Sequence, residues 1–228
     1  MSTSERGNRI VGGGRTSAVR TSKARAGAPW TFHLGYGSLC LDFANTVSWR
    51  GSEAPADHLP TYGELIRFAV QTGVLSPAEG RRLGRCAGSH PELARRTLRR
   101  AHDLREALYR FLADLTAGRG PRPADLEALN RALPGALARL QLAPHGHRIR
   151  WTWHGNPDAL DRPLWPVVRD AAVFLTSADL SRLRACRNPR CRWIFLDTSK
   201  SRTRRWCSMA VCGNRDKLRR FRRRRRPA

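Results

Sequence analysis

Apolar side chains recur every three or four residues through the middle of the chain, which is the spacing of amphipathic helices. The longest of these stripes predicts a helix over residues 91–117, and Gly118 can supply the left-handed residue that commonly follows a helix. Two further stripes predict helices over residues 124–133 and 162–178, the first broken near Pro134 because proline lacks a backbone N–H. The middle of the chain is therefore expected to be mostly helical.

Capping patterns mark the start of two shorter helices. Thr61 and Ser76 are each followed three residues later by a glutamate, Glu64 and Glu79, and such a pair can satisfy the free N–H groups at a helix start. Gly73 is expected to end the first of these helices. Both helices precede the longest one.

Alternating apolar and polar residues follow the helical region and predict a β-hairpin with strands over residues 137–142 and 148–154. Ile149, Trp151 and Trp153 fall on one face of the second strand, and we expect this face to pack on the core. The alternative is that the two tryptophans stack on nucleic-acid bases. The helices and the hairpin together predict a mainly α fold with a small β-hairpin, of the α+β class.

Residues 39–47, LCLDFANTV, fit two local structures. Leu41 and Phe43 flank a polar residue as in a strand, but the wider apolar spacing also fits one face of a helix. Asp42 and Asn45 are polar residues inside this apolar run. They either line a ligand pocket or form a buried hydrogen-bonded pair or cap, since buried polar groups need partners. We favour the second interpretation.

Charge is concentrated at the ends of this 228-residue chain, which carries +25 overall. Residues 182–228 hold 18 Lys/Arg and 2 Asp/Glu (+16), residues 1–29 hold 6 and 1 (+5), and residues 30–181 hold 19 and 15 (+4). Such asymmetry indicates a polyanionic partner such as nucleic acid, the alternative being a solubilising tail. The first segment, rich in Gly, Ser, Thr and Arg, is predicted to be a disordered basic arm.

The length of the chain, 228 residues, fits one medium domain followed by a small one. Its content of hydrophobic residues, 40%, is enough to form a core. The chain contains no apolar run long enough to predict a membrane span. Its first 29 residues also lack the apolar segment of a signal peptide. We therefore expect a cytoplasmic protein without a membrane partner.

Four of the six cysteines form two matched pairs near the C-terminus. Cys186 and Cys191, and then Cys207 and Cys212, are each separated by four residues. Four thiolates close a tetrahedral structural zinc site, so we interpret these cysteines as the ligands of one Zn²⁺ ion. Disulfides and unrelated buried thiols are the alternatives, and nothing in the sequence indicates the secretion that would favour disulfides. Every histidine lies at or before His154, so a mixed site would need a distant ligand.

Two motifs carry a family resemblance. The run RRWCSMAVCGNRDK, residues 204–217, resembles the CGNR zinc finger, together with the upstream CRNPRC and WIFLD segments. GSLCLDFANTVSWRG, residues 37–51, resembles the LDFxNT motif that opens the ABATE domain. The resemblance covers roughly residues 30–226 and implies an ABATE-like domain over residues 30–181 with a CGNR-type finger over residues 182–228. It favours a helix at LDFANT and implies a bacterial, stress-linked transcription regulator whose finger binds DNA.

Within the finger, the expected order of knuckle, hairpin and helix is that of a treble-clef-like module. Leu218 and Phe221, three residues apart on the terminal helix, are expected to pack on it. Loss of zinc is expected to unfold residues 186–212 and to leave the body folded. Arginine and lysine side chains here are candidate nucleic-acid contacts, because they bind phosphate and, for arginine, guanine. These residues are Arg190, Arg192, Lys200, Arg202, Arg204, Arg205, Arg215, Lys217, Arg219, Arg220, Arg222 and Arg223.

Three functions remain open from the sequence. The first is a DNA-binding transcription regulator whose body senses a small-molecule ligand or forms a homodimer. The second is an RNA- or ribosome-associated zinc protein. The third is an enzyme with a pocket around Asp42, Asn45, Asp57 and His58, but the chain has no P-loop, GxSxG or HExxH motif. We therefore expect no enzymatic activity.

Overall fold

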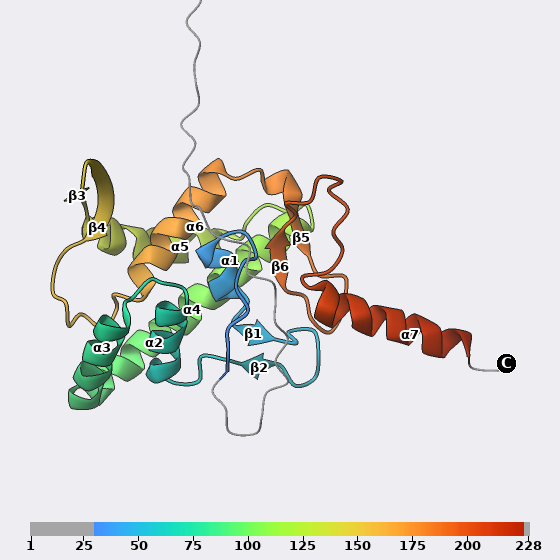
Figure 1. Ribbon diagram of the computed structural model, residues 1–228, viewed down its shortest axis with the longest axis horizontal. Helices are drawn as coiled ribbons and strands as arrows, with labels where there is room; N and C mark the ends of the chain where they lie inside the picture. The colour runs from blue at the N-terminus through green and yellow to red at the C-terminus, as the bar shows by residue number, and fades with distance from the viewer. Residues whose placement is uncertain (1–29, 226–228) are drawn as a thin grey trace, which may run out of the picture.

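A computed structural model describes residues 30–225, so the predicted basic arm lies outside the described residues (Figure 1). The fold is mostly helical with small two-stranded sheets, as predicted. The helices are α1 (Leu39–Ala44), α2 (Tyr62–Gln71), α3 (Pro77–Ser89), α4 (Pro91–Thr116), α5 (Pro123–Leu137), α6 (Leu164–Ser177) and α7 (Asn214–Arg224). The strands are β1 (Val47–Ser48), β2 (Ala56–Asp57), β3 (Leu140–His145), β4 (Arg148–Trp153), β5 (Leu183–Ala185) and β6 (Ile194–Leu196). A 3₁₀ turn, η1 (Leu180–Arg182), and a π-helical turn, η2 (Met209–Gly213), complete the description.

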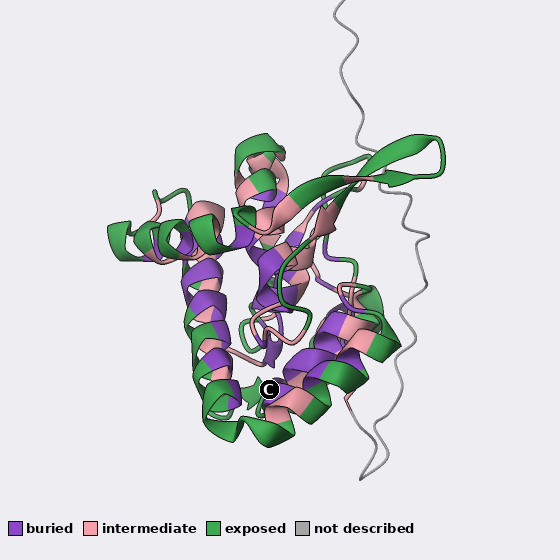
Figure 2. Cartoon of the chain, turned by 90° about the vertical axis from the view of Figure 1, so that its left-hand side faces the viewer, coloured by how far each residue is buried: buried purple, intermediate pink, exposed green. Residues whose placement is uncertain are grey.

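Helix α4 lies at the centre of the fold and contacts α1, α2, α3, α5 and the strands β5 and β6. The predicted stripe is confirmed, since Ala101, Leu104, Leu108 and Leu112 are buried along it. Figure 2 shows how buried and exposed residues alternate around the helices. Gly118 follows the helix with a φ of +70°, the left-handed conformation expected of it.

Both predicted helix starts are confirmed. The Thr61 side chain accepts the N–H of Glu64, and Ser76 forms a complete reciprocal capping box with Glu79. The predicted break at Pro134 is wrong, because α5 continues to Leu137. A proline in the last turn removes a single intrahelical bond, and its own carbonyl still accepts the N–H of residue 138.

The hairpin is confirmed, with β3 and β4 paired antiparallel, but its first strand runs over Leu140–His145 and not residues 137–142, because α5 continues to Leu137. The predicted core packing of the second strand is wrong for two of its three apolar residues. Ile149 and Trp151 are 65% and 54% exposed, whereas Trp153 packs against Trp165 with ring centroids 6.1 Å apart. The reason is that the two strands project beyond α5 and α6, so only the residues nearest the helices reach the core (Figure 2).

The LCLDFANTV segment begins as helix α1, so the strand alternative is wrong for residues 39–44. The chain then turns into β1, which pairs antiparallel with β2. Helix α1 packs against α4 and α6 and also contacts β6 of the C-terminal segment. The motif therefore lies at the junction between the helical body and the cysteine-containing segment.

The C-terminal segment shares one hydrophobic core with the body. Trp193, Ile194 and Phe195 are buried in the same apolar cluster as α1 and α4. The indole N–H of Trp193 donates to the carbonyl of Val47 at 2.7 Å, and the N–H of Leu196 donates to the carbonyl of Tyr36 at 2.8 Å. The two regions are thus packed together as one body.

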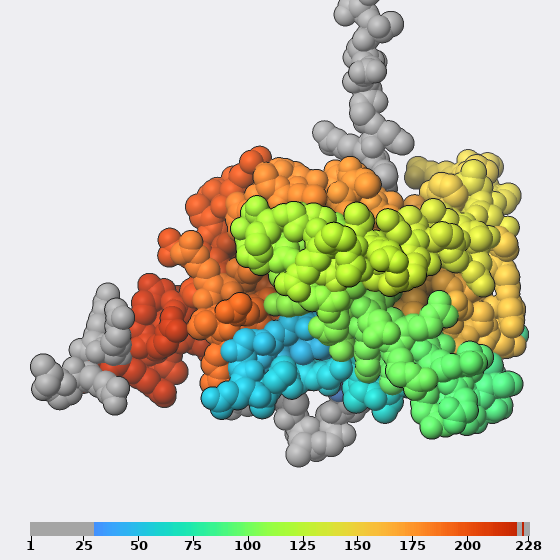
Figure 3. Space-filling model, turned by 180° about the vertical axis from the view of Figure 1, so that it is seen from behind, coloured from blue at the N-terminus to red at the C-terminus, as the bar shows by residue number. Residues whose placement is uncertain are grey.

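Helix α7 projects from one end of the molecule, and the hairpin lies at the opposite end (Figure 3). Leu218 and Phe221 are 49% and 51% exposed, so the predicted packing of these residues on the finger is wrong. An α-helix advances about 1.5 Å per residue, so α7 extends past the small module after its first turn. None of the described helices is both long and apolar enough to cross a bilayer.

Candidate metal centre and basic surface

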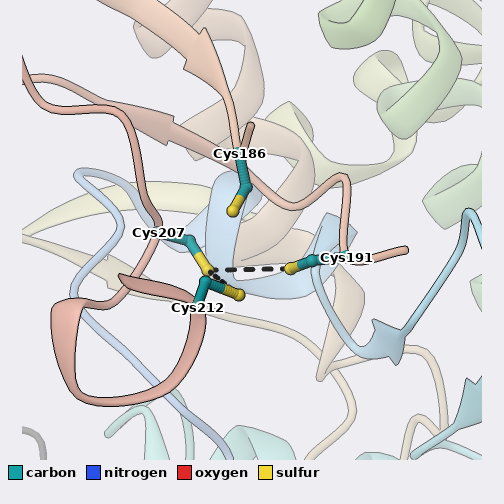
Figure 4. A group of neighbouring side chains, drawn as sticks. All are labelled: Cys186, Cys191, Cys207 and Cys212. Carbon is teal, nitrogen blue, oxygen red and sulfur yellow. Dashed lines mark hydrogen bonds between the residues drawn. The ribbon is translucent and has the colours of Figure 1, made fainter. Parts of the chain in front are cut away.

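The chain brings the four predicted cysteines together at the base of α7. Cys186 follows β5, Cys191 closes a turn before β6, Cys207 follows the next loop, and Cys212 lies in η2. Their ligand atoms all lie within 4.8 Å of one another, and all four residues are buried. The sulfur atoms point toward a common centre (Figure 4).

The distances between these sulfur atoms fit a tetrahedral zinc ion. The Sγ of Cys207 lies 3.7 Å from the Sγ atoms of both Cys191 and Cys212. With Zn–S bonds of about 2.3 Å, neighbouring sulfurs of a tetrahedron lie about 3.8 Å apart. All six cysteines of the chain are free, and the measured separation is far above the roughly 2.05 Å of a disulfide bond. The cluster is therefore fit to hold one structural Zn²⁺ ion.

Ionisation of the cluster points the same way. Hydrogen bonds from neighbouring thiols, Cys191 first, hold the pKa of Cys186 well below its ordinary value. The pKa of Cys207 is raised, because its S–H bonds to the other sulfurs, Cys186 first, and because it is buried. Without a cation the cluster holds a mixture of thiolate and thiol, since like charges this close oppose full ionisation. A divalent cation removes this obstacle, so metal binding would release protons.

Asn188 organises the turn between the first two cysteines. Its carbonyl accepts the N–H of Cys191 at 2.9 Å, and its side-chain oxygen accepts the N–H of Arg190 at 3.2 Å. Its amide also donates to the Sγ of Cys212 at 3.6 Å, which ties the two halves of the cluster together. This bond to sulfur was not predicted from the sequence.

The second half of the cluster is held by η2 and its flanking residues. The hydroxyl of Ser208 accepts the N–H of Val211 at 3.3 Å. A Cβ atom at Gly213 would lie 2.7 Å from the Sδ of Met209, so a larger residue there would require the exposed Met209 side chain to move.

Two family models match these features. One, ABATE, described as "Putative stress-induced transcription regulator", matches residues 37–178, and the CGNR zinc finger model matches residues 182–225. The chain belongs to the ABATE family. A search of the curated proteins found no match. The ABATE region thus contributes α1 to α6, and the CGNR finger contributes the metal centre and α7.

The two polar residues of the ABATE motif have partners inside the protein. The amide of Asn45 donates to the carbonyl of Ile194 at 2.7 Å and accepts its N–H at 3.0 Å. Asp42 accepts the N–H groups of Gly35 and Tyr36, and burial raises its pKa to about 6. Asn45 is buried and Asp42 is half-buried, and neither lines the aromatic cavity described below.

The two other residues of the possible enzymatic pocket, Asp57 and His58, also have partners inside the protein. Asp57 pairs with Arg105 at 2.6 Å, and the Nε2 of His58 lies 2.7 Å from the Oγ of Ser48. Burial lowers the pKa of His58 to about 4, so the ring is neutral at pH 7. The description of the family is that of a transcription regulator rather than an enzyme.

Most of the predicted basic residues lie exposed on the finger and α7, but one points inward. Arg204 is half-buried, donates to the carbonyls of Trp206 and Cys207, and covers the ring of Phe195 at 4.5 Å. Its guanidinium is thus hydrogen-bonded to the backbone that carries Cys207. The exposed members are Arg190, Arg192, Lys200, Arg202, Arg205, Arg215, Lys217, Arg219, Arg220 and Arg222. The side chain of Arg223 lies outside the described set.

Sequence reasoning did not identify the role of Trp49. Its backbone has a φ of +57°, and the guanidinium of Arg215 lies 4.3 Å from the centre of its ring. This cation–π pair joins the ABATE region to the first turn of α7. Its partners are far apart in sequence, so no local pattern could have revealed it.

Proposed function

We propose that this ABATE-family chain is a DNA-binding transcription regulator that docks its zinc finger and α7 on DNA. The observation that carries the proposal is the placement of α7. The four-cysteine cluster lies at the base of this helix, and exposed lysine and arginine side chains surround the part that projects. Residues 182–228 carry a net +16, so a polyanion would be attracted to this end of the molecule.

The ABATE region would then supply regulation in the cytoplasm, through a small-molecule effector, homodimerisation or both. Support comes from the shared core, because a change in the body can reach the metal centre through β6 and Trp193. The exposed hairpin residues Leu142, Ile149 and Trp151 offer apolar surface that a second copy could cover. Light scattering with and without DNA tests dimerisation, and a strictly monomeric mass would reject it.

Two matched charge variants test the docking surface. One replaces Lys217, Arg220 and Arg222 on α7 with glutamine. The other replaces Arg96, Arg99 and Arg100, which are exposed on α4, so both lose three positive charges. We expect the α7 variant to lose duplex affinity by at least about tenfold in low salt and the α4 variant to change by about twofold at most. Equal losses would reject α7 as the docking element.

RNA is the second candidate partner, because a basic finger attracts any polyanion. Tagged protein captured from cells and treated with DNase or RNase separates the two partners. Loss of bound material with DNase alone supports DNA. Loss with RNase alone would assign the chain to RNA- or ribosome-associated proteins instead.

A further inference from the structure

Two concave spaces meet at the Trp49–Arg215 pair. A cavity of about 270 Å³ lies between the start of the ABATE region and the metal centre, with Trp30, Tyr36, Trp49 and Trp193 among its walls. A second space of about 220 Å³ lies on the other side of the pair. Together the two reach the size of ordinary small-molecule sites, roughly 300–1,000 Å³.

The first space is an aromatic cavity. Indole and phenol rings line it, and no aspartate or glutamate does. One face of Trp30 stacks on His58 with ring centroids 3.7 Å apart, and Tyr36 contacts Trp193 edge to face at 5.3 Å. These contacts hold the walls in place before any ligand arrives. Preformed aromatic walls favour a flat ring, since stacking rewards a planar π-system.

The second space is a basic groove. Arg190, Arg215 and Arg219 line it together with one acid, Asp216, whose side chain pairs with Arg219 at 2.7 Å. Among the described residues, neither Arg190 nor Arg215 forms an ion pair. Their guanidinium groups therefore remain available to an anion, and arginine binds phosphate in a bidentate manner.

We propose that these two spaces form one nucleotide site, with a nucleobase in the aromatic cavity and its phosphate in the basic groove. Arg215 contacts both parts, because it lines each space and already covers the ring of Trp49. Of the described residues, Arg215 is the one arginine among the walls of the cavity, whereas Arg190 and Arg219 also line the groove, so the phosphate is placed in the groove.

A nucleotide can reach this site from two sources. A free mononucleotide would act as an effector that reports to the first turn of α7. An unpaired base of a nucleic-acid strand would anchor that strand beside the basic helix. Both present the same chemistry, a flat base joined to a phosphate.

Titration calorimetry of the zinc-loaded full chain tests the site with the four 5′-ribonucleoside monophosphates. Ribose 5-phosphate lacks the base and uridine lacks the phosphate. We expect both to bind more weakly than the mononucleotide that binds best. Trp30→Ala removes a wall of the cavity, and Arg215→Gln removes the residue shared by both spaces. We expect each to weaken binding by about 5- to 100-fold. Trp151→Ala and Arg99→Gln are matched controls outside both spaces and should change binding by less than about twofold.

Competition with an unstructured oligothymidylate shows whether the site binds a free mononucleotide or an unpaired base of a nucleic-acid strand. Displacement of the mononucleotide by the oligonucleotide assigns the site to a strand, and binding of the mononucleotide alone assigns it to an effector. Absence of binding by both ligands at millimolar concentration overturns the proposal. So does equal binding by the Trp30→Ala, Arg215→Gln and control proteins. Duplex affinity that depends on Lys217, Arg220 and Arg222, which line neither space, is independent of these results, so the nucleotide site and the DNA-binding function can fail separately.

Discussion

Asn45 connects the ABATE motif to the zinc finger through a single amide. Both hydrogen bonds to Ile194 are buried, so removal of the side chain leaves a donor and an acceptor of the backbone without partners. We expect Asn45→Ala to lower the free energy of unfolding by about 2–4 kcal/mol. Urea unfolding of the zinc-loaded protein measures the change. Asn130→Ala, at an exposed position of α5, is the control and should change stability by about 0.5 kcal/mol or less.

Asp42 should make stability depend on pH. Burial raises its folded pKa to about 6 from an unfolded value of 3.8, so the folded state holds the proton more tightly. Its contribution is therefore fully present below about pH 4 and is lost as pH rises through 6. The loss amounts to about 3 kcal/mol at most.

His58 acts in the opposite direction over a similar range. Its pKa falls to about 4, so its contribution is present above the unfolded value of 6.5 and is lost as pH falls toward 4. The informative quantity is thus the difference in unfolding free energy between the wild type and Asp42→Asn, measured from pH 4 to 7. We expect this difference to shift against the wild type with rising pH. A difference that stays constant would reject the raised pKa.

At the scale of elements, local signals were enough to predict much of the fold. The hydroxyl caps at Thr61 and Ser76 act within four residues, and the stripe of α4 needs only its own periodicity. The matched cysteine pairs likewise predicted the cluster. Predictions of burial failed where a helix or strand extends beyond the core on which it packs, as at Trp151 on the hairpin and Phe221 on α7. An apolar pattern in the sequence cannot show where that core ends.

Contacts between segments that are far apart in the sequence could not be predicted either, and Gly51 makes one of these contacts. Its N–H donates to the carbonyl of Arg190 at 3.2 Å, and a Cβ atom there would lie 1.9 Å from the carbonyl oxygen of Pro189. We expect Gly51→Ala to force the β1–β2 loop away from the cysteine turn and to cost about 1–3 kcal/mol of stability.

Thermal unfolding of Gly51→Ala measures this cost, and a second alanine variant calibrates it. Gly88 lies within α3 and has nothing within 4 Å of its Cβ position. Gly88→Ala should therefore stabilise the protein slightly, by about 0.5–1 kcal/mol. Changes of the same sign in both variants would show that the close approach at Gly51 does not constrain the fold.

At the scale of the whole molecule, the shared core changes what zinc removal should do. The sequence predicted that residues 186–212 would unfold alone, but Trp193 and Ile194 are buried against α1 and β1. We now expect chelation to increase amide hydrogen exchange in residues 39–48 as well as in the finger. Residues 77–89 of α3, which pack on α2 and α4, should change little.

Two cysteine variants control the chelation experiment. Cys207→Ser removes a proposed ligand and should reproduce the exchange pattern of the chelated protein. Cys86→Ser changes a cysteine outside the cluster and should keep one zinc per chain. Full zinc occupancy in Cys207→Ser would contradict the ligand assignment, and exchange confined to residues 186–212 would restore the view of two separate modules.

The salt dependence of DNA affinity should show which charged segments of the chain contact phosphates. Each phosphate neutralised contributes about −0.9 to the slope of log K against log salt, so roughly five to seven contacts give a slope of about −5 to −6. Deletion of residues 219–228 removes seven arginines and should reduce the slope by several units while zinc stays bound. Deletion of residues 1–29 removes 6 Lys/Arg that lie far along the chain from the finger, and should reduce it much less. Fluorescence anisotropy with one duplex across a salt series measures all three slopes. A slope that survives the first deletion unchanged would place the DNA contacts elsewhere on the molecule, because the deletion removes seven arginines from the C-terminal end of the chain.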